Sequence, residues 1–220
     1  MRLNDPVTRL LFPNKCILCG KLLEAPEVHL CCRCATDIPE ALKLKRKIPF
    51  LKGAFALWYY EKNVRSSLLR FKFHRRRSYA QGYGAILARK LPELKENYDL
   101  IVWVPVSKWR KLKRGYDQVE LIAHALCKEL GLTPVICLKK IRHNPPQSGI
   151  VSAAQRRANV LGAYRVPNPD AVKGKRVLLL DDIITTGATI SECAKTLLAA
   201  GAKEVYGAAV AVARQHTINQ

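Results

Sequence analysis

Continuous apolar runs alternate along this chain with segments whose apolar residues recur at helical spacing. The runs predict strands of a parallel sheet, which are buried on both faces. They cover residues 53–60, 100–106, 134–138, 177–181 and 204–212. The helical spacing predicts helices, the first two strongly basic, over residues 68–77, 78–91, 118–130 and 152–159. Strands that alternate with helices are typical of βαβ units, so the sequence predicts an α/β fold.

Two acidic residues end the apolar run of VLLLDDIITTGATI, residues 177–190. Asp181 and Asp182 directly follow four apolar residues, and a Thr/Gly-rich turn and a helix come next. Gly201 is placed to end that helix. Because ligands gather at the carboxyl ends of strands in open α/β sheets, we expect a binding site at this acidic pair.

The turn after the acidic pair is suited to a phosphate. It offers hydroxyls and backbone N–H groups at a helix N-terminus, from Thr185, Thr186, Gly187, Ala188 and Thr189. Adjacent carboxylates are good acceptors for vicinal sugar hydroxyls, so a ribose 5-phosphate fits the segment. A Walker B interpretation needs a G-x-x-x-x-G-K-[ST] loop, which this sequence lacks. A turn-and-cap interpretation explains Thr186 but not the two preceding acids.

Five of the eight cysteines fall within residues 16–34. Four of them form two C-x-x-C pairs, namely Cys16, Cys19, Cys31 and Cys34. Four thiolates suit tetrahedral zinc and leave no position for a substrate, so the sequence predicts a structural zinc site. Cys32 could take the place of Cys31, and His29 is a second substitute ligand.

The chain carries a formal charge of +21, from 38 Lys+Arg against 17 Asp+Glu. Residues 62–114 hold 15 of these cations and only three acids, a surplus of 12. Over half of the net charge therefore lies in a quarter of the chain. Such a surplus favours polyanionic partners, either nucleic acid or phosphorylated small molecules.

Aromatic side chains are interleaved with cations in RFKFHRRRSYAQGYG, residues 70–84. The cations are Arg70, Lys72, Arg75, Arg76 and Arg77, and the aromatics are Phe71, Phe73, Tyr79 and Tyr83. This pattern predicts a groove that stacks the bases of single-stranded DNA. An amphipathic helix with its aromatics in the core explains the same spacing, so both interpretations stay open at this point.

Four stretches of the chain together resemble the ComF family of competence-associated proteins. They are the double C-x-x-C segment, VPVSKWRKLKRGYDQ (104–118), RHNPPQSGIVSAAQRRANVLGAY (142–164) and VLLLDDIITTGAT (177–189). The last stretch resembles the 5-phosphoribosyl 1-pyrophosphate (PRPP) motif of type I phosphoribosyltransferases. The resemblance implies a type I phosphoribosyltransferase-like parallel sheet with flanking helices, preceded by a small four-cysteine zinc-binding domain. We expect these two domains to cover residues 1–47 and 48–220.

The resemblance also implies roles for single residues. PRPP would bind at Asp181, Asp182 and the turn that follows them, together with Mg²⁺, which prefers oxygen ligands such as phosphates. Arg114, Gly115 and Gln118 would belong to the loop that binds the pyrophosphate. Arg156 and Arg157 would lie on a flap that closes over PRPP and excludes water.

Two functions fit the sequence. The first is a PRPP-binding protein that handles single-stranded DNA in natural transformation, with other competence proteins such as a DNA-translocating helicase as partners. The alternative is an active phosphoribosyltransferase that transfers ribose 5-phosphate from PRPP to an unidentified nucleophile, for which we find no catalytic base. The sequence has no signal-peptide or membrane-spanning pattern. We therefore expect a cytoplasmic protein that does not insert into a membrane.

Overall fold

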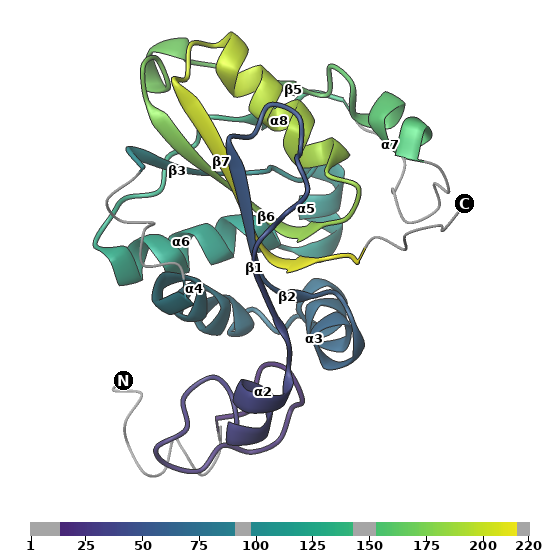
Figure 1. Cartoon of the computed structure of the whole chain (residues 1–220), viewed down its shortest axis with the longest axis vertical. Helices are drawn as coiled ribbons and strands as arrows, with labels where there is room; N and C mark the ends of the chain where they lie inside the picture. Colours follow the sequence, from purple (N-terminus) through teal and green to yellow (C-terminus); the bar gives the residue numbers. More distant parts are fainter. Residues whose placement is uncertain (1–13, 91–97, 143–152, 215–220) are drawn as a thin grey trace.

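A mostly parallel sheet of five strands lies at the centre of the computed structural model, which describes residues 14–90, 98–142 and 153–214 (Figure 1). The strands, in spatial order, are β1 (Glu40–Lys43), β2 (Gly53–Tyr59), β7 (Glu204–Val212), β6 (Arg176–Ile184) and β3 (Leu100–Trp103). Only β1 is antiparallel to its neighbour in this sheet. The predicted α/β fold with a parallel sheet is therefore confirmed.

Helices cover both faces of the sheet because side chains of its central strands alternate between two cores. Leu178 and Leu180 of β6 pack in the core with α3, α4 and α6. Leu179 packs on the opposite face with α8. The bounds are α3 (Lys62–Phe73), α4 (Tyr79–Lys90), α6 (Gln118–Leu130), α7 (Ala153–Val160) and α8 (Ala188–Ala199).

The strand predicted over residues 134–138 is absent, and this prediction is wrong. Cys137 and Leu138 are buried and the N–H of Val135 donates to the carbonyl oxygen of Ile101 in β3, but this single backbone bond does not make the run a strand. The strand in this region is β4 (Lys139–Lys140), which pairs antiparallel with β5 (Tyr164–Arg165). An apolar run alone therefore did not distinguish a buried loop from a buried strand.

The segment after β3 also differs from its prediction. The strand ends at Trp103, and Pro105 has no N–H to extend the ladder. Arg114, which the resemblance assigns to a loop, instead ends a short helix, α5 (Lys108–Arg114), and Ser107 caps the start of this helix. Gly115, with φ of 78°, ends α5 in the left-handed conformation.

The N-terminal unit consists of a short bridge between Lys15 and Leu22 and of α2 (Cys32–Asp37). It lies below α3 and α4 in Figure 1. Because β1 pairs with β2 in the main sheet, residues 40–43 belong with the larger unit. We therefore propose a domain boundary between α2 and β1, at residues 38–39 instead of the predicted 47–48.

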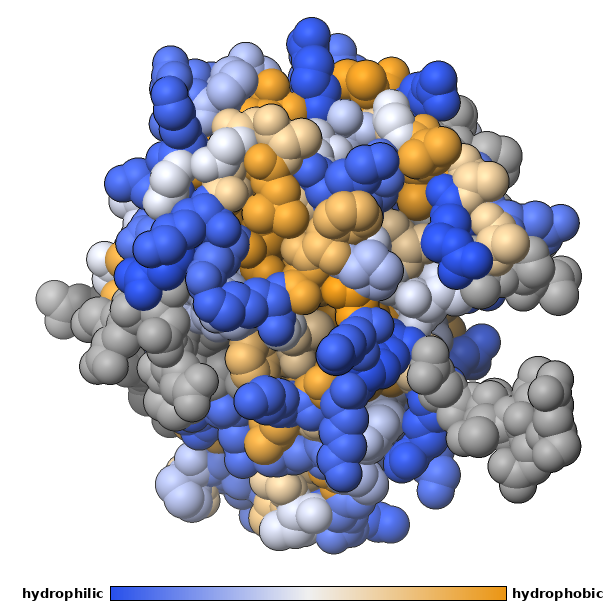
Figure 2. Space-filling view, turned by 45° about the horizontal axis from the view of Figure 1, so that its top comes forward, coloured by the Kyte–Doolittle hydropathy of each residue, from blue (hydrophilic) through white to orange (hydrophobic). Residues whose placement is uncertain are grey.

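The surface is mixed. Hydrophilic side chains surround a central band of hydrophobic ones on the face that Figure 2 shows. Among the described residues, no helix is long and apolar enough to cross a membrane.

Candidate functional site

A cavity of about 750 Å³ opens at the carboxyl ends of β3 and β6, where the sequence predicts a binding site. The two acids Asp181 and Asp182 of β6 line it, with Thr185 and Thr189 from the following turn. Cations surround them from several elements, namely Lys72, Arg75, Arg110, Lys113, Arg114, Lys140 and Arg156. A volume of this size suits a ligand as large as a phosphorylated sugar.

Asp182 lies on the face of β6 that is covered by α3 and α6. Its Oδ2 accepts hydrogen bonds from Lys72 Nζ and from Gln118 Nε2, each at 2.8 Å. The side chains of Asp182 and Lys72 are only 9% and 16% exposed. Burial acts to raise the pKa of Asp182, but the Lys72 cation and these hydrogen bonds outweigh it and lower the pKa. Asp182 therefore stays ionised inside the protein.

Asp181 points to the opposite face of β6, as strand alternation requires. Its charge acts there on Tyr164, Cys193 and Lys140. Burial, and then the neighbouring charge of Asp182, raise the pKa of Asp181 well above its usual range. Two adjacent carboxyl groups thus have opposite preferences for a proton, because Asp182 accepts hydrogen bonds from Lys72 and Gln118, whereas burial dominates at Asp181.

We predict that Asp181→Asn leaves stability unchanged or raises it near pH 7. The raised pKa means that folded protein keeps a proton that the unfolded chain loses above about pH 4. Wild-type stability should therefore fall as pH rises from that value toward the raised pKa, and the variant should lack this fall. Melting temperature measured against pH tests the prediction, with the exposed Asp170→Asn as a matched control. A larger fall in the variant than in the wild type would contradict it.

The turn after β6 is held from outside by the segment that precedes β2. Arg46 donates to the carbonyl oxygen of Thr185 at 2.6 Å, and Thr186 Oγ1 accepts from the N–H of Ala188 at 3.3 Å. Gly187 has φ of 83°, and a Cβ there would lie 3.1 Å from Ile48 Cγ2. The fold itself therefore explains this glycine, and α8 begins directly after it.

The predicted pyrophosphate loop reaches the same cavity. Arg114 donates to Gln118 Oε1 at 2.8 Å, and Gln118 in turn donates to Asp182. Gly115 does not line the cavity, and its carbonyl oxygen accepts from Arg77 at 2.9 Å. The structure thus joins Arg114 and Gln118 to the acidic pair in one hydrogen-bonded chain.

The predicted flap is described only in part. Arg156 of α7 lines the cavity, whereas Arg157 is exposed and does not line it. Residues 143–152, which include the Pro-Pro and Ser-Gly pairs of the predicted flap, lie outside the described residues.

Three further cations, Arg110, Lys113 and Lys140, line the cavity although the sequence pattern did not single them out as site residues. Lys140 lies on the two-residue strand β4, too short to give a periodic signal. Burial, and then the charge of Arg110, lower the pKa of Lys140. Arg110 and Lys113 belong to a basic run in which nothing in the sequence distinguishes the side chains that line the cavity.

The interleaved aromatics of residues 70–84 are mostly core residues. Phe71, Tyr79 and Tyr83 are buried, which decides for the amphipathic-helix interpretation at these positions. Only Phe73 is exposed, at 63%, and it lines the mouth of the cavity. These aromatics therefore do not form a continuous stacking groove.

The predicted DNA-binding cations fall into two groups. Arg70 donates to the carbonyl oxygen of Leu18 at 2.6 Å, and Lys72 pairs with Asp182, so both charges have internal partners. The other three cations are exposed between α3 and α4 and are Arg75, Arg76 and Arg77. We therefore leave Arg70 and Lys72 out of any outer DNA surface.

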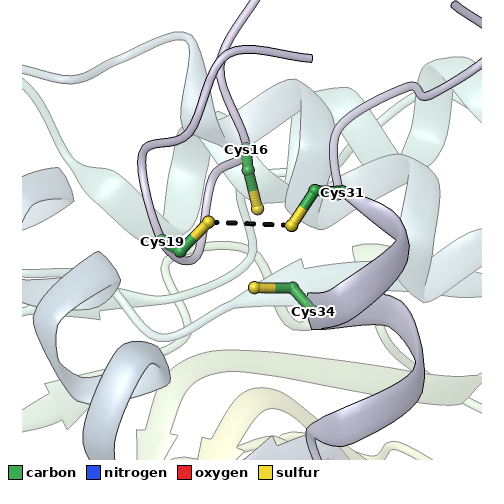
Figure 3. Close-up of side chains that lie close together, drawn as sticks. All are labelled: Cys16, Cys19, Cys31 and Cys34. Carbon is green, nitrogen blue, oxygen red and sulfur yellow. Dashed lines mark hydrogen bonds between the residues drawn. The ribbon is translucent and has the colours of Figure 1, made fainter. Parts of the chain in front are cut away.

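Four cysteines of the N-terminal unit converge, as Figure 3 shows. They are Cys16, Cys19, Cys31 and Cys34, and all their Sγ atoms lie within 4.8 Å of one another. The Cys19 and Cys31 sulfurs are 3.7 Å apart. Bonds of about 2.3 Å to one tetrahedral zinc place sulfurs about 3.8 Å apart, so the cluster fits a structural metal. Cys32 and His29 lie outside it, and all eight cysteines are free thiols.

The chain is similar to known proteins over the part that carries β6 and the turn after it. The phosphoribosyl transferase domain family matches residues 119–219, which include β6 and the turn after it. Competence protein F of Haemophilus influenzae is 34% identical over 53% of this chain and 48% of its own. The match thus spans about half the length of that relative.

Two further relatives cover more of the chain. DNA utilization protein YhgH of Salmonella typhi is 26% identical over 89% of this chain and 96% of its own. Competence protein ComFC of Streptococcus pneumoniae is 31% identical over 68% of this chain and 64% of its own. Among solved structures, a glutamine PRPP amidotransferase from B. subtilis matches 63% of this chain and 30% of its own, with 23% identity and a TM-score of 0.44.

Proposed function

We propose that this chain, a phosphoribosyl transferase domain protein related to competence and DNA utilization proteins, binds PRPP in the cavity at the end of β6. The observation that carries the proposal is the combination of two carboxyl groups with a surrounding set of cations in one cavity. Carboxyl groups suit sugar hydroxyls, and cations suit phosphates. A phosphorylated sugar with a pyrophosphate group is a ligand that uses both.

The parts of PRPP have separate positions in this proposal. Its 5-phosphate lies on the turn 185–189, at the N-terminus of the 12-residue helix α8. Its ribose hydroxyls lie at Asp181 and Asp182, and the ionised Asp182 accepts from one of them. The pyrophosphate lies toward Arg110, Arg114 and Lys140, and Mg²⁺ bound with it would neutralise part of its charge.

Binding is supported better than turnover. No histidine is among the described residues that line the cavity, so these residues supply no obvious base for an incoming nucleophile. Calorimetric titration with PRPP, with and without Mg²⁺, tests the binding. Release of pyrophosphate in the presence of ammonia, nucleobases or single-stranded DNA would support the alternative, an active phosphoribosyltransferase. Absence of PRPP binding would refute both functions.

The mouth of the cavity supports a second part of the proposal, the handling of single-stranded DNA. Phe73 and Trp109 line the cavity with 63% and 55% of their surface exposed. The guanidinium of Arg114 lies 5.2 Å from the Phe73 ring centroid, and the ammonium of Lys113 lies 5.1 Å from that of Trp109. Exposed aromatics among cations suit the bases and phosphates of a single strand.

We predict that Arg75→Glu with Arg76→Glu weakens binding of single-stranded DNA. Each lost phosphate contact should flatten the dependence of log K on log salt by about 0.7, so two contacts flatten it by about 1.4. Fluorescence anisotropy over a series of salt concentrations measures this slope. The matched control is Lys173→Glu with Lys175→Glu, two exposed cations outside the cavity. Equal losses of DNA affinity in the two double variants would argue against a DNA-binding surface at Arg75 and Arg76.

The cysteine cluster completes the proposal. We propose that it holds one Zn²⁺, because its four sulfurs converge at the spacing of a tetrahedral zinc site. Four protein ligands leave no coordination position for a substrate. The metal is then structural.

A further inference from the structure

Helix α3 is bonded to the loop that carries the first two cysteines. The hydroxyl of Ser67 donates to the carbonyl oxygen of Ile17. Arg70 donates to the carbonyl oxygen of Leu18 at 2.6 Å. Ile17 and Leu18 are the two residues between Cys16 and Cys19, so α3 holds the middle of one C-x-x-C pair.

The same helix supplies the cation that pairs with Asp182 in the cavity. Lys72, close to the end of α3, lies 2.8 Å from Asp182, and both side chains are largely buried. Phe73, the last residue of α3, lines the cavity mouth. The carboxyl group that we assign to a ribose hydroxyl is thus held by α3 on one side and by Gln118 of α6 on the other.

The two sets of contacts lie on different faces of α3. Ser67 and Arg70 are three residues apart and share one face, whereas Arg70 and Lys72 are about 200° apart around the helix axis. One face therefore contacts the cysteine loop and another contacts β6. Leu68 and Phe71, which are both fully buried, hold α3 between the cysteine loop and β6. A displacement of the loop is then transmitted to Lys72 through a packed, rigid element.

We propose that α3 couples the cysteine cluster to the cavity, so that the loop 16–19, with its metal bound, keeps Lys72 on Asp182 and sets the affinity for PRPP. This inference rests on the proposed function of the cavity. A C-x-x-C unit this small folds with its metal, so loss of the metal releases the carbonyl groups that Ser67 and Arg70 contact. Coupling between sites is reciprocal, so PRPP raises the affinity for zinc by the same factor.

The first test compares two variants of the zinc-loaded full chain. Arg70→Met should keep one zinc per chain but bind PRPP about tenfold more weakly, within the range typical of coupled sites. Arg65→Met, on the same helix but exposed, should bind PRPP like the wild type. Arg70→Met with its zinc and an unchanged PRPP affinity would overturn the coupling, and so would an equal loss in Arg65→Met.

The second test needs no variant and no PRPP. Hydrogen exchange of the α3 amides is measured in the wild-type chain before and after zinc is removed by a chelator. Faster exchange over residues 66–73 without zinc is the expected result, and equal protection would overturn the coupling. A wild-type chain that fails to bind PRPP refutes the proposed function instead, and the exchange measurement still decides whether α3 depends on the metal.

Discussion

Asp182→Asn is expected to weaken PRPP binding about 10- to 100-fold and to destabilise the protein. A hydrogen bond to a charged group contributes about 1.5–3 kcal/mol, which gives the loss in affinity. The neutral side chain also removes the ion-pair partner of the largely buried Lys72, and breaking a buried ion pair from one side costs about 3–5 kcal/mol. Calorimetry measures the first effect, and denaturant unfolding measures the second.

The double variant Lys72→Met with Asp182→Asn separates these effects. It leaves no buried cation without a partner, so most of the lost stability should return. PRPP affinity should stay low, because the charged acceptor is still missing. Asp170→Asn, an exposed carboxyl outside the cavity, is the control for the substitution itself. If Asp182→Asn bound PRPP with wild-type affinity, the assignment of a ribose hydroxyl to Asp182 would be wrong.

The stability from the Lys72–Asp182 pair also fixes the direction of its pH dependence. The pKa of Asp182 is lowered in the folded protein, so this contribution is present above the usual carboxyl pKa of about 4. It is lost as pH falls through the lowered value. Asp181 acts in the opposite direction, which makes the two single variants distinguishable in one pH series.

Cys16→Ser is expected to abolish zinc binding and unfold the N-terminal unit. Structural zinc contributes about 10–16 kcal/mol of binding free energy in zinc-finger peptides, and a unit this small has little else to hold it. Cys16, Ile17 and Leu18 also belong to the core shared with α3 and α4, so the whole chain should melt at a lower temperature.

Elemental analysis and limited proteolysis measure these two losses. Cys32→Ser is the matched control, because Cys32 is exposed and outside the cluster. It should keep one zinc per chain and melt like the wild type. Loss of zinc from Cys32→Ser, or a wild-type protein purified without zinc, would contradict the assignment.

Much of the fold was predictable from the sequence because its signals are local. The strand Glu204–Val212 and the helix Gln118–Leu130 have the predicted bounds, since an apolar run and a helical period each depend on neighbouring residues. The resemblance to the ComF family is likewise confirmed by the phosphoribosyl transferase domain and by relatives named competence protein F and ComFC. The four metal-ligand candidates were predictable because the spacing of each C-x-x-C pair already brings two thiolates together.

The sequence by itself determined most of the longer elements, the acidic pair that lies in β6 and the cysteine cluster. Only the tertiary structure decided how these residues are used. It turned Arg70 toward the cysteine loop and Lys72 toward Asp182, and it placed Lys140 in the cavity from a strand too short to predict. The reason is physical. Whether a charged side chain is solvated or paired depends on groups distant in sequence, which only the packed chain brings within hydrogen-bonding distance.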